Sequence, residues 1–252
     1  MANTTLQHDG IYHLSEIHRP KVTRAEAVYQ HLTQLLLDGK LSEGDELPSE
    51  AELARTFEVS KPIVREALRK LEVMSIIKIR HGKPPIVSPI DGKPLQLYLQ
   101  LALTSMESGL TESIELRRVL ECHAASLAAL NATPEDFEYL NSLIEELTAH
   151  QDNTDKWVEL DLAFHHEIAR LSGNQLLKFM IEALGKIMGN IMRSLHHRTD
   201  LRDPAATIER HRRVYQAIAA NDPDAARTEM NNHFDASLPV AHAIAGNGDD
   251  TT

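Results

Sequence analysis

Residues 59–68 read Val-Ser-Lys-Pro-Ile-Val-Arg-Glu-Ala-Leu, and this stretch decides the fold of the N-terminal part of the chain. Ser60 is a residue type that caps helices. Pro62 follows in the first turn, where its missing N–H would have had no partner within the helix. Apolar residues continue at helical spacing through Leu71. The pattern therefore predicts a helix that is capped by Ser60 and ends near Met74.

A shorter helix is predicted just before this one. Ser49 and Glu52 stand three residues apart in front of an apolar run, which is the spacing of a capping box. The helix is expected to end at about Arg55, only a few residues before Ser60. Two helices joined by so short a turn form a helix-turn-helix. A further helix is expected earlier in the chain, over residues 24–38.

Two short strands are predicted after the helix-turn-helix. Apolar residues within 76–79 and at 86–87 flank a turn, residues 81–84, with the sequence His-Gly-Lys-Pro. A strand pair with a basic tip, placed behind a helix-turn-helix, forms a wing. The sequence therefore predicts a winged helix-turn-helix domain over residues 19–90.

The rest of the chain has the pattern of helices alone. From Leu95 onward apolar residues recur with a period of 3.6, and no alternating strand pattern interrupts them. This predicts an all-α helical bundle over residues 91–245 and a mainly α chain, with residues 1–18 and 246–252 as disordered tails. The helices are expected at residues 92–106, 111–131, 134–150, 155–172, 175–197, 204–221 and 223–245.

The net charge of −11 is divided unevenly between the two predicted domains. Residues 19–90 contain twelve basic and ten acidic residues, whereas residues 91–252 contain fourteen basic and twenty-five acidic ones. Within residues 57–83 the basic excess sharpens to seven against three. A basic N-terminal module thus precedes an acidic C-terminal one, and the overall negative charge does not exclude a nucleic-acid partner.

The composition also limits the compartment. No apolar run approaches the ~18 residues needed to span a bilayer, and residues 1–20 lack the basic start and apolar centre of a secretion signal. Cys122 is the only cysteine, so intrachain disulfides and a thiolate zinc cluster are excluded. These features favour the cytosol and argue against a membrane partner.

The predicted second helix of the helix-turn-helix has the residues needed to read DNA. Such a helix needs donors near its N-terminus that reach base edges, and cations farther along that reach phosphates. Lys61 and Arg65 suit the first role, and Arg69 and Lys70 the second. A basic helix face can be merely solvated, but here it coincides with a helix-turn-helix and a basic wing. The residues expected to contact double-stranded DNA are Ser60, Lys61, Pro62, Arg65, Arg69, His81, Gly82 and Lys83.

Four polar residues interrupt the apolar faces of the C-terminal helices. Asp161 and His165 are spaced i,i+4 and so share one helix face, while His166 points about 100 degrees away. His211 and His233 each lie in the apolar stripe of a later helix. Separate burial of these groups would be costly, whereas one divalent metal could bind them all. Zn, Mn, Ni or Fe suits such donors, and a set of unrelated core histidines is the alternative.

The N-terminal motifs resemble a known family. Residues 47–54, Leu-Pro-Ser-Glu-Ala-Glu-Leu-Ala, and residues 59–68 are similar, without gaps, to the winged helix of GntR-family bacterial transcription regulators. The wing turn at residues 81–84 resembles that of the fatty-acid-responsive member after which the FadR subfamily is named. The resemblance implies an operator-binding winged helix.

Two positions depart from the family pattern. The family usually has Arg where this chain has Ala51 and Lys61, and both positions touch the operator in relatives. Arg65 matches the family. Because Arg grips guanine with two hydrogen bonds and Lys does so less rigidly, the family's usual operator cannot be assumed for this chain.

The C-terminal part resembles the FCD ligand-sensing domain. The resemblance is carried by residues 161–165 (Asp-Leu-Ala-Phe-His), 172–174 (Ser-Gly-Asn), 209–211 (Glu-Arg-His) and by His233. Relatives bind metal through the matching residues, so it implies a divalent metal site, with Zn as the first choice and Mn, Ni or Fe as alternatives. The implied ligands are Asp161, His165, His211 and His233.

An effector site is also implied. Four protein ligands leave positions open on an octahedral metal, which a small organic acid could fill with a carboxylate and a hydroxyl or keto oxygen. Arg117 resembles the family's pocket-lining Arg and could hold that carboxylate, although an ordinary i,i+4 pair with Glu121 is the alternative. Asn174 could donate to the effector or cap the helix that follows it.

Together these features predict a homodimeric transcription regulator, expected to be a repressor, in the bacterial cytoplasm and at the nucleoid when bound to DNA. A small carboxylate metabolite would modulate its affinity for a two-fold operator. A metal-dependent hydrolase is the alternative from another class, but it lacks an obvious general base and would give the winged helix no role. A third possibility is a regulator whose helical domain is a purely structural, metal-bound dimerisation module.

Overall fold

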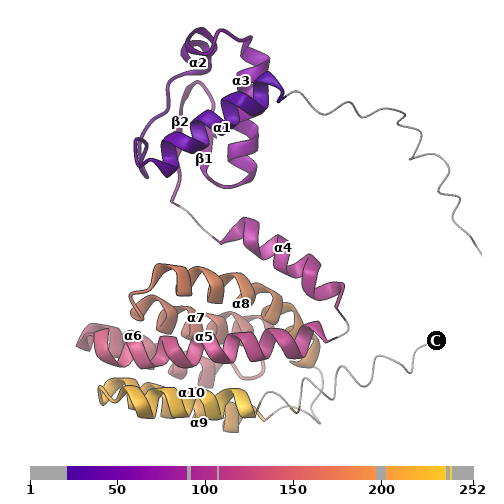
Figure 1. The fold of residues 1–252 in the computed structure, drawn as a ribbon. Coiled ribbons are helices and arrows are strands. Elements are labelled where there is room, and N and C mark those ends of the chain that lie inside the picture. The colour runs from indigo at the N-terminus through magenta and orange to yellow at the C-terminus, as the bar shows by residue number, and fades with distance from the viewer. Residues whose placement is uncertain (1–21, 90–91, 107, 197–202, 237–238, 240–252) are drawn as a thin grey trace, which may run out of the picture. The chain divides into compact units, whose positions relative to one another are not determined.

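The computed structural model divides the chain into two compact units, which meet after residue 90. The first contains a winged helix and the second is all helix, so the predicted mainly α fold class is confirmed (Figure 1). The predicted tails, residues 1–18 and 246–252, lie outside the described residues. The structure describes residues 22–89, 92–106, 108–196, 203–236 and 239.

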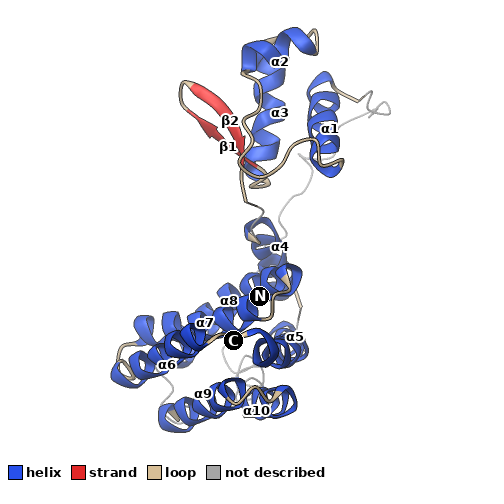
Figure 2. Cartoon of the chain, turned by 90° about the vertical axis from the view of Figure 1, so that its left-hand side faces the viewer, coloured by secondary structure: helices blue, strands red, loops and turns tan. Residues whose placement is uncertain are grey.

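Three helices and a two-stranded sheet form the first unit (Figure 2). Apolar side chains from all five elements share one core, in which Leu32, Leu68 and Leu71 are fully buried. This core fixes the helix-turn-helix against the first helix and the wing. The elements are α1 (Arg24–Leu37), α2 (Glu50–Thr56), α3 (Lys61–Val73), β1 (Ile77–Arg80) and β2 (Lys83–Val87).

The wing is an antiparallel hairpin with a tight tip. Ile77 lies opposite Val87, and Arg80 lies opposite Lys83, with an irregularity in the register just before Arg80. Gly82 adopts a φ of +68°, a left-handed conformation that glycine accepts without strain. The wing therefore presents His81, Gly82 and Lys83 at an exposed turn.

The two helices of the helix-turn-helix begin differently. At α2 the predicted capping box is present: the Glu52 N–H donates to the Ser49 hydroxyl (3.3 Å), and the Ser49 N–H donates to the Glu52 carboxylate (2.8 Å). Ser60 is the N-cap residue of α3, as predicted, but its side chain makes no capping hydrogen bond. A cap bonds the N–H of the second or third helical residue, and the second, Pro62, has none. The Ile63 N–H donates to the Ser60 backbone carbonyl instead (3.0 Å).

The second unit is a helical bundle whose helices begin at the predicted turn residues. Asp203 accepts from the Ala206 N–H and Asp222 from the Ala225 N–H, each at 2.9 Å, so these residues cap α9 and α10. The helix predicted over residues 223–245 is described as helix to Asp235. The helices are α4 (Lys93–Thr104), α5 (Gly109–Asn131), α6 (Pro134–Ala149), α7 (Thr154–Leu171), α8 (Gln175–His196), α9 (Pro204–Ala219) and α10 (Pro223–Asp235).

Helices α5 to α10 all contribute side chains to the core of the bundle, and both views place α9 beside α10 (Figures 1 and 2). Four fully buried alanines of α5, within residues 124–129, let neighbouring helices approach closely. Leu160, Phe164 and Ile168 of α7 fill the space between them. Residues one position away from this stripe, Asp161 and His165, are therefore also carried into the interior. None of the helices in the described ranges is long and apolar enough to cross a membrane.

Candidate metal centre and DNA-reading surface

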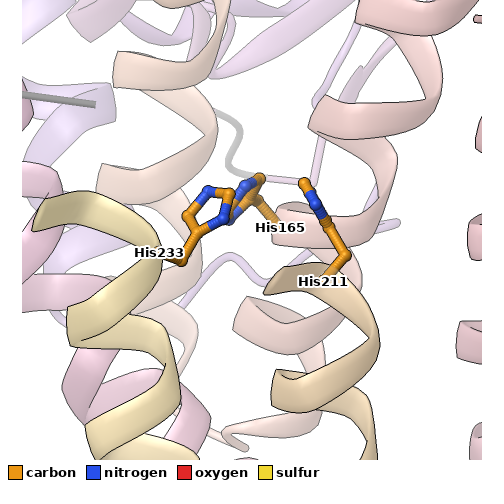
Figure 3. Close-up of side chains that lie close together, drawn as sticks. All are labelled: His165, His211 and His233. Atoms are coloured by element: carbon orange, nitrogen blue, oxygen red, sulfur yellow. The ribbon is translucent and has the colours of Figure 1, made fainter. Parts of the chain in front are cut away.

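Three buried histidines from three helices converge in the interior of the bundle (Figure 3). His165 comes from α7, His211 from α9 and His233 from α10, and one ring nitrogen of each lies within 4.8 Å of the others. Only 2%, 1% and 8% of these residues is exposed. Small ring rotations would bring all three nitrogens onto one ion, for which Zn–N distances are about 2.0–2.1 Å.

Asp161 lies beside this cluster, one turn before His165 on the same face of α7. Its Oδ1 is 3.1 Å from Nε2 of His211, and its Oδ2 is 3.9 Å from Nε2 of His165. Burial would raise the pKa of Asp161, but the neighbouring imidazoles, His211 first, hold that pKa well below its usual range. The group therefore carries a negative charge next to the three nitrogens, although it stands outside the set in which all atoms lie within 4.8 Å.

The ring of His211 turns one nitrogen toward Asp161. Nδ1 of His211 lies 2.8 Å from the Thr207 carbonyl oxygen, which can only accept a hydrogen bond, so Nδ1 carries a hydrogen and Nε2 is the nitrogen that faces the carboxylate. This Nε2 is buried, and its neighbour among the described residues is Oδ1 of Asp161 at 3.1 Å. Burial, followed by the charges of the other two histidines, lowers the pKa of His233. Buried imidazole nitrogens gathered beside a carboxylate are donors that suit a divalent cation.

His166 does not belong to this cluster. Its ring faces α8, where a side chain added at Gly185 would place its Cβ 2.6 Å from Nε2 of His166. Burial lowers the pKa of His166 to about 4, so the ring is neutral at pH 7. The preceding residue, His165, faces α9 and α10 instead, because consecutive residues of a helix point in different directions.

Arg117 and Glu121 form a second buried layer behind the histidines. Nε of Arg117 donates to Oε1 of Glu121 (2.6 Å), and Oε2 of Glu121 lies 2.5 Å from Nδ1 of His165. From the sequence, Glu121 was expected only as an ion-pair partner of Arg117, and no candidate base was expected near the ligands; the structure corrects this by placing the Glu121 carboxylate against His165. In the sequence, only the i,i+4 spacing of Arg117 and Glu121 pointed to this pair. That spacing does not show which helix the pair faces.

Asn174 occupies the start of α8. Its Oδ1 accepts from the Leu177 N–H (3.1 Å), and its own N–H donates to the Ser172 hydroxyl (3.2 Å). The side chain thus caps the helix, which is the alternative that the sequence left open beside effector binding. Asn174 is an exposed residue.

All eight residues predicted to contact DNA are exposed on the winged helix. Arg65 has a defined partner: its Nε and Nη2 donate to the two carboxylate oxygens of Glu50 at 3.2 and 2.7 Å. This forked pair spans α2 and α3, and 53% of the Arg65 side chain stays accessible. The guanidinium is therefore held on the outer surface of the helix-turn-helix.

Two basic residues of the same segment serve the fold instead. Lys70, which was expected to reach a phosphate, has its Nζ 2.9 Å from Oε2 of Glu26 on α1, and this hydrogen bond raises its pKa. Arg80 braces the wing, because its Nη2 lies 2.5 Å from Oε1 of Glu46 and 2.8 Å from the Pro84 carbonyl oxygen. The basic excess available to DNA is smaller than the sequence count indicates.

Comparisons with known proteins agree with both units. The model of bacterial regulatory proteins of the gntR family matches residues 24–87, and the FCD domain model matches residues 112–236. An uncharacterized HTH-type transcriptional regulator of Bacillus subtilis, YcbG, is 32% identical over 213 residues, covering 84% of this chain and 87% of that protein. The chain belongs to the GntR family.

Other relatives of this GntR-family chain have named roles. The transcriptional repressor NanR of Klebsiella aerogenes is 29% identical (83% of this chain, 82% of NanR), and the Glc operon transcriptional activator of Escherichia coli K12 is 28% identical (82% and 85%). A solved structure, Streptococcus agalactiae GntR, aligns with a TM-score of 0.66 and 26% identity over 86% of this chain and 99% of that one.

The matches assign a class of function. The chain is a winged-helix, DNA-binding transcription regulator, and its FCD domain agrees with the FadR subfamily. Because the matching families and relatives are regulators of transcription, the metal-dependent hydrolase alternative is wrong.

Proposed function

We propose that this regulator represses its target genes and that a small organic-acid metabolite, bound at a divalent metal in the FCD domain, changes its affinity for operator DNA. The observation that supports the proposal is the buried cluster of three histidine nitrogens within 4.8 Å of one another, next to an ionised aspartate. The residues that would hold the metal are Asp161, His165, His211 and His233. Zn is the first choice, and Mn, Ni or Fe are the alternatives.

The metal would supply positive charge and open coordination positions for an acid. Four protein ligands occupy four positions, and a carboxylate with an adjacent hydroxyl or keto oxygen would complete an octahedron. A purely structural metal would offer no such binding. The response to acids therefore separates the sensing FCD domain from a simple dimerisation module.

Arg210 is a candidate for the effector's carboxylate that the sequence reasoning did not name. Its Nη2 donates to the Thr207 hydroxyl (2.8 Å), whereas its buried Nε has no hydrogen-bond partner among the described residues, and burial lowers the pKa of Arg210. It lies next to His211 on α9, one turn before Arg213, whose Nε reaches Glu229 of α10 at 3.5 Å. Arg210 thus lies on the side of α9 that faces α10, the helix that carries His233. A carboxylate there would accept a hydrogen bond from this Nε.

Arg117 and Asn174, the effector-binding residues that the sequence suggested, are already engaged. Arg117 donates to Glu121, and Asn174 caps α8. In the proposed complex Arg210 holds the carboxylate. Arg117 and Asn174 contribute only if the effector displaces their present partners.

A thermal-shift screen tests the sensing proposal. Zinc-loaded protein is mixed with a panel of 2-hydroxy and 2-oxo carboxylates, with acetate as the control. An acid at a hundred times its Kd should add about 2.7 kcal/mol of stability, which corresponds to roughly 5–10 °C in Tm. Arg210→Met should keep the shift caused by zinc and lose the shift caused by the acid. A panel in which no acid raises Tm would favour the structural metal.

We also propose a homodimer on a two-fold operator, acting at the nucleoid in the cytoplasm. Helix α4 has no buried residue, and large apolar side chains project from it: Leu97, Tyr98 and Leu101 are 62%, 71% and 63% exposed. Apolar side chains at this density on one helix favour a protein contact. Analytical ultracentrifugation of the parent and of Leu97→Lys/Leu101→Lys should give a dimer and a weakened dimer, respectively.

The operator's base sequence is expected to depend on two positions. Ala51→Arg/Lys61→Arg should shift the preference toward the family's common operator, because each Arg can pair with guanine in a fork. Selection from random duplexes by parent and double variant measures the change. Identical preferences would mean that neither position reads bases in this chain.

A further inference from the structure

We propose that Glu121 is the positioning residue that orients His165 toward the metal site, and that Arg117 acts through Glu121 and not as a ligand of the effector. The inference rests on the proposed metal centre and assigns a role to the buried layer behind it. It concerns three side chains in series: a guanidinium on α5, a carboxylate one turn later on α5, and an imidazole on α7.

The contact between Glu121 and His165 fixes the state of the ring. Oε2 of Glu121 lies 2.5 Å from Nδ1 of His165, both atoms are buried, and within the described ranges neither has another hydrogen-bond partner. A carboxylate can only accept, so a slight rotation of the ring lets Nδ1–H donate to it. Nε2 is then left with its lone pair, on the side where Asp161 lies. Of the two ring nitrogens, Nε2 is therefore the one available to a metal.

The same arrangement recurs at a second ligand. Nδ1 of His211 faces the carbonyl oxygen of Thr207 at 2.8 Å, and its Nε2 faces Asp161 at 3.1 Å. Two histidines from different helices thus turn the same nitrogen toward the same carboxylate. One is oriented by the backbone of its own helix, and the other by Glu121. His165 has to be oriented by a side chain because its Nδ1 faces α5 and not a backbone carbonyl of its own helix.

Arg117 supplies the opposite charge to this buried carboxylate. Glu121 is 1% exposed, and Nε of Arg117 donates to its Oε1 at 2.6 Å. Arg117 is itself 3% exposed, and its guanidinium carbon lies 5.5 Å from the ring centre of Phe234. The guanidinium is therefore occupied by Glu121 on one side and packed against α10 on another.

Two other interpretations compete with this proposal. In the first, Arg117 and Glu121 form a buried ion pair that only stabilises the bundle, and in the second, Arg117 is a ligand of the effector. These two and the positioning role differ in the effect that they predict on the binding of zinc alone. A structural pair has no effect on zinc affinity once the protein is folded, and neither does an effector ligand. A positioning carboxylate changes both zinc affinity and the hydrogen location on His165.

The test uses Arg117→Met/Glu121→Gln in the full-length chain. Removing both charges avoids leaving Arg117 buried and unpaired, which is the change that most often destroys a fold. Zinc affinity is measured by competition with a chromogenic chelator, and the tautomer of His165 by nitrogen-15 NMR of labelled imidazoles in the metal-free protein. We expect about 10- to 100-fold weaker zinc binding and loss of the uniform Nδ1–H form of His165.

A matched control is available on the same helices. Arg118 and Asp235 form an ion pair of 3.0 Å that also joins α5 to α10, but at a partly exposed site. Arg118→Met/Asp235→Asn removes the same charges and should leave zinc affinity and the His165 tautomer unchanged. If the buried double variant does not fold, Glu121→Asp keeps the charge beside Arg117 but withdraws it from His165, and should weaken zinc about tenfold.

Zinc affinity within twofold of the parent in the folded variant, or an unchanged His165 tautomer, would overturn the role of Glu121. A parent that binds no zinc would overturn the proposed metal centre instead, and the tautomer of the metal-free protein would still report on Glu121. The two failures are therefore distinguishable.

Discussion

Replacement of His211 with Ala is expected to release the metal from the FCD domain and to lower the melting temperature by the amount that the metal contributes. In the proposed centre His211 is one of four protein ligands, and α9 holds no second imidazole that could take its place. A metal present at a thousand times its Kd adds about 4 kcal/mol to the free energy of unfolding, and this contribution disappears with binding. The variant also loses the edge contact between His211 and Phe164, whose ring centres are 4.8 Å apart.

Elemental analysis of purified protein measures the metal directly. The parent should carry one equivalent per chain after growth in metal-replete medium, and His211→Ala and His233→Ala should carry almost none. His166→Ala is the matched control, because this imidazole lies on the same helix as His165 but faces α8. It should retain the full equivalent. If His211→Ala retains a full equivalent, the histidines do not share a metal and only pack in the core.

The thermal comparison separates metal loss from packing loss. Treating the parent with a chelator should lower its Tm most of the way to that of His211→Ala, and the chelator should barely affect the variant. DNA affinity in the absence of effector should change less than stability does. A ligand alters DNA binding only through unequal affinity for two arrangements of the domains, so the metal by itself need not shift that balance.

The fold was accessible from sequence because its decisive signals are local. The capping box of Ser49 and Glu52 and the prolines at helix starts act within one turn, and so does the period of the apolar residues. The missing side-chain bond at Ser60 is also local: Pro62 has no N–H to donate, and the Ile63 N–H donates to the Ser60 backbone carbonyl.

Only part of the candidate site could be predicted from the sequence. The proposed ligands show up in the spacing along a helix, whereas the residues that support them depend on how the helices pack. Asp161 and His165 share one helix face, which spacing alone reveals. The approach of Glu121 to His165 depends on which face of α5 packs against α7, and small alanines decide that packing. Spacing along α5 predicted the ion pair with Arg117 but could not place it beside a ligand.

For the same reason, ion pairs between residues far apart in the chain could not be predicted from the sequence. Lys70 pairs with Glu26, 44 positions earlier, and Arg80 with Glu46, 34 positions earlier. From the sequence, Lys70 was expected to reach a phosphate, and Arg80 was counted in the basic excess of residues 57–83. Only the packing of α1 on α3, and of the wing on the loop before α2, makes them partners within the protein.

Replacement of Arg65 with Ala is expected to abolish specific operator binding and leave the fold intact. One forked contact between Arg and a guanine contributes about 1–3 kcal/mol of discrimination, or about 5- to 150-fold in affinity. The cost to stability should be small, because the pair with Glu50 is surface-accessible and such pairs contribute about 0–1 kcal/mol. The operator for this measurement is the sequence that the parent selects from random duplexes, compared with a scrambled duplex at the same salt concentration.

Two variants divide the role of Arg65 between its charge and its geometry. Arg65→Lys keeps the positive charge but loses the fork, so it should retain affinity for scrambled DNA and lose discrimination. Glu50→Gln removes the carboxylate that now holds the guanidinium at 2.7 Å, and should keep discrimination, because the Arg that reads the base is still present. Its affinity for any duplex should rise slightly, since a negative charge next to the phosphates has been removed. If Arg65→Ala prefers the operator over scrambled DNA as strongly as the parent does, Arg65 reads no base, and discrimination must come from other residues of the winged helix.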